Sequence, residues 1–173
     1  GPKALKYGVT KDYVLNLEIV LTSGEVVMTG ANVLKNSTGY NLTQLMIGSE
    51  GTLAVITKIV FKLIPKPIKD ITMLVPFYCI EEACKSVSKV FSSGLNPSAL
   101  EFMERDAIDW TIRFSDISMM IEDGIEAHLL IEFDGNDTDV LYENCQKTSA
   151  LMSDFKCGVI LIADSQRQKD QLW

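Results

Sequence analysis

Hydrophobic and polar positions alternate along residues 15–21, and an apolar run resumes at residues 26–28 after the turn residues Thr22-Ser23-Gly24-Glu25. Two such runs joined by turn residues are typical of a β-hairpin. Residues 30–40 are rich in Asn, Ser, Thr and Gly and have no period of either kind, which predicts a loop. Loops of that length usually carry a function.

A short helix and a long strand are predicted after this loop. Asn41 and Gln44 resemble a capping box in front of a one- or two-turn helix over residues 42–47. Residues 52–64 are rich in β-branched side chains and predict one long strand, which Pro65 ends.

Helical and strand patterns alternate more regularly in the rest of the chain. Strands are predicted over residues 71–77, 99–103, 127–133 and 158–163, and helices over residues 81–91, 105–114, 137–153 and from Ser165 onward. This is the β-α-β-β-α-β order of a ferredoxin-like layer, with an additional helix between the middle strands. We therefore expect an α+β protein in which a domain boundary separates residues 1–67 from residues 68–173.

Composition excludes several classes of partner. The 173 residues carry a net charge of −7 with scattered Lys and Arg, whereas a nucleic acid needs a clustered basic face. No apolar run reaches the roughly 18 to 20 residues of a membrane-spanning helix. The four cysteines are widely spaced and form no C-x-x-C pair, which predicts reduced thiols in the cytoplasm. One histidine without paired cysteines argues against a zinc site.

The most informative segment is Gly48-Ser49-Glu50-Gly51. Two glycines allow a tight turn with positive φ, and without a Cβ they let a flat or anionic ligand approach the main chain. It is not a P-loop, because no Lys follows the second glycine. From composition alone the segment is more typical of a plain helix-to-strand turn than of a ligand site, and both interpretations stay open.

Longer motifs around this segment resemble a known family. The stretches G-P-K-A-L-K-Y-G-V-T-K-D-Y-V and T-G-Y-N-L-T-Q-L-M-I-G-S-E-G-T-L-A-V-I-T resemble the second half of the FAD-binding domain of FAD-linked oxidases. This implies the vanillyl-alcohol-oxidase fold, in the branch of the glycolate oxidase flavin subunit, D-lactate dehydrogenase and D-2-hydroxyglutarate dehydrogenase. The stretches S-A-L-E-F-M-E and L-L-I-E-F-D-G are similar to that family's substrate or cap domain, an antiparallel sheet with helices.

The resemblance implies a flavin cradle. The family's G-S-E-G-T-L-G-V-I-T loop and strand lie along FAD, which implies cofactor contacts for Gly48, Ser49, Glu50, Gly51, Thr52, Val55 and Ile56. The similarity of the K-N-x-x-G-Y stretch adds four secondary candidates: Lys35, Asn36, Gly39 and Tyr40. Ala54 stands where the family usually has glycine, and its methyl group is expected to crowd the dinucleotide.

The function implied is that of a parent enzyme. It would oxidise a small D-2-hydroxy acid, such as glycolate or D-lactate, by hydride transfer to FAD. A second acceptor, which the sequence does not identify, would reoxidise the flavin. No catalytic or metal-binding residue is assigned, because the family's carboxylate-binding arginine and metal-binding histidines have no counterpart here. We expect an inactive fragment that self-associates. A folded fragment without flavin and a ferredoxin-like metabolite-binding domain remain alternatives.

Three polar residues of the predicted strands have structural interpretations. His128 lies beside Leu129 and Leu130 and is expected to be a structural or rim histidine. Glu132 and Asp134 share one face at period 2, which predicts a solvated strand face.

Overall fold

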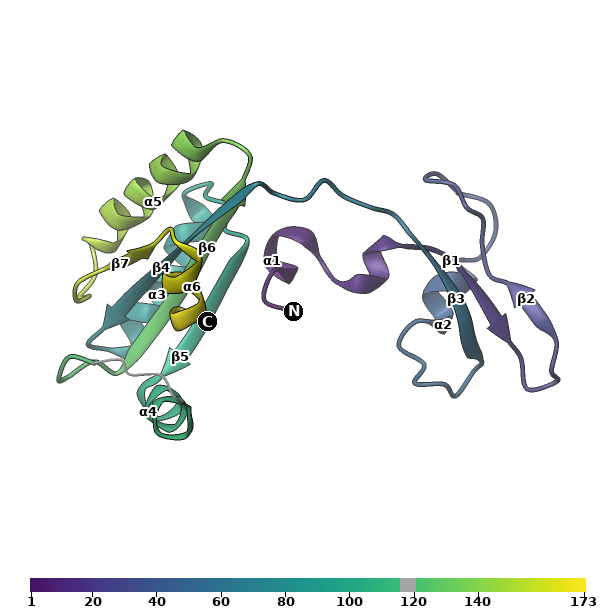
Figure 1. Cartoon of the computed structure of the whole chain (residues 1–173), viewed down its shortest axis with the longest axis horizontal. Coiled ribbons are helices and arrows are strands. Elements are labelled where there is room, and N and C mark those ends of the chain that lie inside the picture. The colour runs from purple at the N-terminus through teal and green to yellow at the C-terminus, as the bar shows by residue number, and fades with distance from the viewer. Residues whose placement is uncertain (116–120) are drawn as a thin grey trace. The chain divides into compact units, whose positions relative to one another are not determined.

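The computed structural model describes residues 1–115 and 121–173, which fall into two compact units (Figure 1). The small unit is Gly8–Lys66, and the large unit is Gly1–Tyr7 together with Pro67–Trp173. The chain therefore starts in the large unit, forms the small one and returns. None of the described helices is long and apolar enough to cross a membrane.

The small unit is a three-stranded antiparallel sheet with one short helix. Its elements are a 3-10 helix (Thr10–Tyr13), β1 (Val14–Val20), β2 (Val26–Met28), α2 (Leu42–Met46) and β3 (Val55–Phe61). The strand order is β2-β1-β3, and α2 contacts β1. The predicted hairpin is confirmed, because β1 pairs with β2 from Glu18 opposite Met28 to Val20 opposite Val26.

The large unit contains a four-stranded antiparallel sheet. Its elements are α1 (Ala4–Tyr7), β4 (Lys69–Phe77), α3 (Ile80–Ser92), β5 (Ala99–Glu104), α4 (Arg105–Phe114), β6 (Ala127–Gly135), α5 (Thr138–Met152), β7 (Leu161–Ala163) and α6 (Gln166–Leu172). The order β5-β6-β4-β7 is that of a ferredoxin-like sheet. The predicted α+β class and the additional helix α4 are confirmed.

The core of the large unit lies between one face of this sheet and the helices α3 and α5, which contact each other and strands β4 and β6. Successive side chains of a strand point to opposite faces. In β6 the residues Ala127, Leu129, Ile131 and Phe133 therefore enter this core together. Asp137 caps the start of helix α5, because its carboxylate accepts hydrogen bonds from the amides of Asp139 and Val140.

The opposite face of β6 carries His128, Leu130, Glu132 and Asp134, all of them buried. The predicted solvated face is therefore wrong. Glu132 is 3% exposed and Asp134 5%, because the lysines at the start of the chain cover them. Lys3 lies 2.7 Å from a Glu132 oxygen, and Lys6 lies 2.6 Å from an Asp134 oxygen.

Two strands are shorter than predicted. Strand β3 spans seven residues rather than 52–64, since Thr52 and Leu53 belong to the preceding turn and its partner β1 is also seven residues long. Strand β7 spans Leu161–Ala163 rather than 158–163, because these three residues form the continuous ladder with β4, whereas Cys157 makes an isolated bridge to Phe77.

Candidate functional site

The turn between α2 and β3 holds the glycine-bracketed candidates. Gly48, Glu50 and Gly51 have φ angles of +85°, +52° and +77°, so three of four successive residues are in the left-handed region. The Thr52 amide and the Thr52 hydroxyl both donate to the Ser49 carbonyl, at 3.0 and 2.6 Å. Gly48 and Gly51 adopt these angles without strain, whereas Glu50 adopts its positive φ at a cost.

The main chain of this turn is open to approach. A Cβ built on Gly48 or Gly51 would meet nothing within 4 Å. Ser49 is half-buried, whereas Glu50, Gly51 and Thr52 are exposed. An open turn with positive φ angles can accept a ligand on its backbone, so this geometry fits a cofactor cradle. The same geometry is also that of an ordinary helix-to-strand turn.

The first residues of β3 continue the turn with apolar side chains. Val55 is 62% exposed and Ile56 40% exposed, so both are accessible to a ligand. Ala54 is only 7% exposed and packs in the core of the small unit with Leu17 and Ile19. The expectation that its methyl group crowds a dinucleotide is therefore not supported by its position, because the methyl group is enclosed by the unit's own core.

The loop 30–41 forms a second feature. Three of its four secondary candidates, Asn36, Gly39 and Tyr40, line a pocket of about 230 Å³, and Lys35 does not. Gly39 has a φ angle of +72°, and Tyr40 is 96% exposed. The pocket and the Gly48 turn share no lining residue. The structure therefore gathers the candidates into two groups within the small unit.

A buried polar network positions this loop, and the sequence interpretation missed it. Asn16 on β1 is 2% exposed. Its side-chain oxygen Oδ1 accepts hydrogen bonds from the backbone amides of Leu17 and Gly30 at 2.9 and 2.7 Å. Its amide nitrogen donates to Asn32 at 2.8 Å. The signal was available, because Asn is depleted in strands and here interrupts an apolar run.

Two threonines extend the network to helix α2. The hydroxyls of Thr29 and Thr43 lie 2.7 Å apart, and both residues are buried. The Leu17 amide donates to the Thr29 hydroxyl at 3.2 Å. Loop, helix and central strand are thereby fixed relative to one another inside the small unit.

Charge separates the two units. Residues 8–66 carry five Lys and four Asp or Glu, whereas residues 1–7 and 67–173 carry eleven Lys or Arg and nineteen Asp or Glu. An anionic ligand such as a dinucleotide is therefore repelled less by the small unit than by the large one.

Other chemistry is sparse in the described residues. No group of three or more His, Cys, Asp or Glu there could hold a metal ion. The four cysteines are free, and burial raises the pKa of the Cys145 thiol to about 11. A thiol with that pKa stays protonated at neutral pH and is a poor nucleophile.

The chain is similar in sequence to proteins of known family. Residues 66–173 match the family described as "FAD linked oxidases, C-terminal domain". The whole chain is 38% identical to a D-lactate dehydrogenase of Anaerostipes hadrus over 177 residues, which cover 37% of that protein. Over 87% of its length the chain is 36% identical to the glycolate oxidase subunit GlcD of Bacillus subtilis, covering 33% of it. The chain thus spans about a third of these relatives.

Solved structures show the same fold at lower identity. An alkyldihydroxyacetonephosphate synthase matches 99% of this chain and 33% of its own with a TM-score of 0.76 and 20% identity. A p-cresol methylhydroxylase matches 92% of this chain and 37% of its own with a TM-score of 0.67 and 16% identity.

Proposed function

Because this chain belongs to the FAD-linked oxidases, we propose that it is part of an enzyme that oxidises a small D-2-hydroxy acid of the glycolate or D-lactate type. Relatives named D-lactate dehydrogenase and glycolate oxidase subunit support that substrate class. The chain spans about a third of their length, so the activity would belong to a longer protein and the 173 residues alone would be inactive.

FAD is the cofactor of this family, and when bound it supplies the acceptor for the substrate's hydride. We propose that the turn from Gly48 to Thr52, with Val55 and Ile56, lies along FAD. The single observation that carries this is the open backbone over Gly48 and Gly51. Main-chain amides of such a turn suit a diphosphate, because they present hydrogen-bond donors without a side chain in the way.

The loop candidates have a supporting role in this proposal. Asn36, Gly39 and Tyr40 line their own pocket, and Lys35 adds a positive charge in the same loop. The buried amide of Asn16 would act as a positioning group, since it holds Gly30 and Asn32 at the start of this loop.

We propose a division of labour along the chain. Residues 1–67 would be the C-terminal half of a FAD-binding domain, and residues 68–173 part of a substrate or cap domain. Free cysteines favour a reducing compartment, so we place the protein in the cytoplasm.

Substitution of Gly51 in the full-length enzyme tests the cradle. G51V is expected to abolish FAD retention, because a β-branched side chain both disfavours a φ of +77° and fills the open space above the turn. Flavin absorbance per mole of purified protein is the measurement.

Gly24 supplies the matched control. It has a φ of +85° with nothing within 4 Å of its Cβ position, and it lies in the hairpin turn of the same unit. G24V therefore imposes similar backbone strain away from the proposed cradle and is expected to retain flavin. Equal flavin content in G51V and G24V would remove the assignment.

A further inference from the structure

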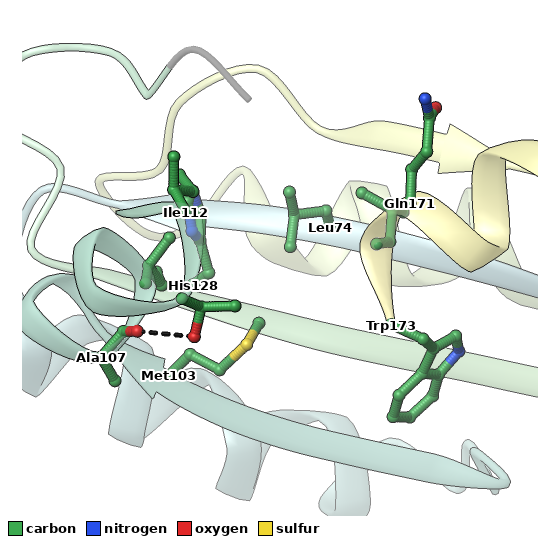
Figure 2. A pocket seen from close by; sticks show the side chains of 10 residues that line it. Leu74, Met103, Ala107, Ile112, His128, Gln171 and Trp173 are labelled. Carbon is green, nitrogen blue, oxygen red and sulfur yellow. Dashed lines mark hydrogen bonds between the residues drawn. The ribbon is translucent and has the colours of Figure 1, made fainter. Parts of the chain in front are cut away.

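The face of the large unit's sheet that lies away from α3 and α5 changes from apolar to charged along β6. Figure 2 shows its apolar part, which forms a pocket of about 190 Å³ beside His128. Farther along the same face of β6 are the buried carboxylates of Glu132 and Asp134. Residues 1–7 contact this charged part and belong to the large unit, although the chain passes from them directly into the small unit.

Five side chains fasten residues 1–7 to the sheet. Lys3 lies 2.7 Å from a Glu132 oxygen, Lys6 lies 2.6 Å from Asp134 Oδ1, and the Tyr7 hydroxyl donates to the same oxygen at 2.8 Å. We call these five side chains the N-terminal latch. Both carboxylates are buried, and a buried charge that loses its partner is costly, so the latch favours its closed state.

The first passage of the chain between the two units is one residue long. It begins at Tyr7 in the latch and ends at Val9, whose amide donates to the Asp12 carboxylate at 2.8 Å. Gly8 lies between these two anchored ends with a φ of +76°, and a Cβ built there would collide with the Asp12 carboxylate. Glycine is therefore needed at this turn, and its two backbone dihedrals are the freedom that this passage has.

The second passage is longer and is also anchored on both sides. In the small unit, the Lys62 amide donates to the Tyr13 carbonyl at 2.7 Å. In the large unit, the Ile68 amide donates to the side-chain oxygen of Asn136 at 3.1 Å. Asn136 directly follows β6, two residues after the carboxylate that holds the latch, so both passages are fastened at the same end of one strand. Residues 63–67 between the anchors form no helix or strand.

The difference in length decides which passage limits reorientation of the units. Five extended residues reach up to about 17 Å, so residues 63–67 tolerate a wide range of orientations. A passage of one residue tolerates far fewer. While the latch is closed, the short passage at Gly8 is therefore the stricter restraint.

We propose that Gly8 is the pivot of a hinge between the small and large units, and that the N-terminal latch restrains this hinge. Opening the latch leaves residues 63–67 as the passage that is still anchored at both ends, and the units then reorient over a wider range. In the enzyme proposed above, this hinge joins the cofactor-binding part to the substrate domain. That consequence rests on the proposed function, whereas the hinge itself is tested without flavin.

Residual dipolar couplings of the ¹⁵N-labelled 173-residue chain test the hinge, because they report the degree of alignment of each unit separately. All samples carry I59K, since Ile59 is 46% exposed on β3 and a charge there limits self-association. With the latch closed, the two units are expected to align to a similar degree. D134N is expected to abolish this similarity, so that the small unit aligns more weakly than the large one.

A milder variant keeps the test valid where D134N fails to fold. Y7F removes one hydroxyl from the latch and leaves both lysines in place, including Lys6 over the aromatic ring. It is expected to speed exchange of the residue 7 amide about tenfold, which is the range of one hydrogen bond to a charged group, and to lower the alignment of the small unit less than D134N does.

Two variants serve as controls. N136A loosens the second passage, and E82Q converts an exposed carboxylate of the same unit to an amide; both are expected to keep the alignments similar. Unequal alignment of the units with the latch intact would overturn the proposal, as would a loss in N136A as large as that in D134N. So would faster exchange of the residue 7 amide in D134N or Y7F without any loss of alignment, because the latch would then open without freeing the hinge.

Discussion

Replacing Asp134 with Asn is expected to release the first seven residues from the sheet of the large unit. The Asp134 side chain is 1% exposed and has three donors from the N-terminal segment. Lys6 lies 2.6 Å from Oδ1, Tyr7 donates its hydroxyl to the same oxygen at 2.8 Å, and Lys3 lies 3.3 Å from Oδ2. Helix α1 has only four residues, too few to be stable alone, so these contacts hold it in place.

The size of the effect follows from the loss of charge. Hydrogen bonds to charged groups contribute about 1.5–3 kcal/mol and neutral ones about 0.5–1.5 kcal/mol, so each good donor loses about 1 kcal/mol when the carboxylate becomes an amide. Lys3 loses least, because its side chain is 47% exposed and its distance is longest. The total loss is about 2–3 kcal/mol, which raises the equilibrium constant for opening of the N-terminal segment about 30- to 150-fold.

The contact also has a pH window. Burial by itself raises the pKa of Asp134, but hydrogen bonds from Lys6 and Tyr7 and the charges of both lysines outweigh it and hold the pKa below its usual value. The stabilisation is present above the unfolded pKa of about 3.9 and is lost as the pH falls through the lower folded value. Burial opposes the charged form of Lys6, yet its contacts with Asp134 raise the pKa, so this contribution persists until the solution is strongly alkaline.

Hydrogen exchange of the Tyr7 amide measures the release, because this amide donates to the Lys3 carbonyl within α1. D134N is expected to speed its exchange by the factor above. E82Q is the control, since Glu82 forms an exposed pair with Lys85 at 3.2 Å and is expected to change stability by less than about 0.5 kcal/mol. Exchange at Tyr7 that is equal in D134N and the wild type would refute the assigned role of the ion pairs.

Two further results are expected from the small unit. N16A should lower its free energy of unfolding by about 2–4 kcal/mol in urea denaturation, because the Gly30 amide loses its acceptor, the Leu17 amide keeps only the Thr29 hydroxyl, and the bond to Asn32 is lost. N36A, whose side chain accepts one exposed bond, should cost far less, and similar losses would contradict this. The 173-residue chain should form dimers or larger species in light scattering, since Ile59 and Phe61 on the edge strand β3 are 46% and 44% exposed. I59K should shift the chain toward monomer. A wild-type monomer at high concentration would contradict this.

Local patterns predicted most of the fold, because they depend on neighbours along the chain. The hairpin at β1 and β2 needs only two apolar runs and a turn. Helices α3 and α5 show the 3- and 4-residue spacing in their buried positions. The segment at Ala4–Tyr7 shows no such period and was not predicted as a helix, because its stabilising partners lie more than 120 residues away.

The candidate site and strand β6 likewise have features that the local sequence predicts and features that depend on residues far away in the chain. The positive φ of Gly48 and Gly51 could be predicted, since glycine between a helix and a strand signals such a turn. The period of β6 correctly placed Glu132 and Asp134 on one face, but a period says nothing about what covers that face. Lys3 and Lys6 cover it, and these are residues that composition had described only as scattered charge.

Burial of polar side chains is what the sequence pattern did not show at Asn16 and Asp134, whereas His128 was expected to be a structural or rim histidine and is buried. Asn16, His128 and Asp134 are each polar side chains at strand positions, and an alternating pattern assigns such residues to solvent by default. Asn16 is buried because it satisfies backbone amides of a loop, and Asp134 because it is paired with lysines, whereas His128 is buried although its Nδ1 has no partner among the described residues. Polar residues in a core are retained when they are paired. Of the three, His128 alone has a polar side-chain atom, Nδ1, without a partner among the described residues.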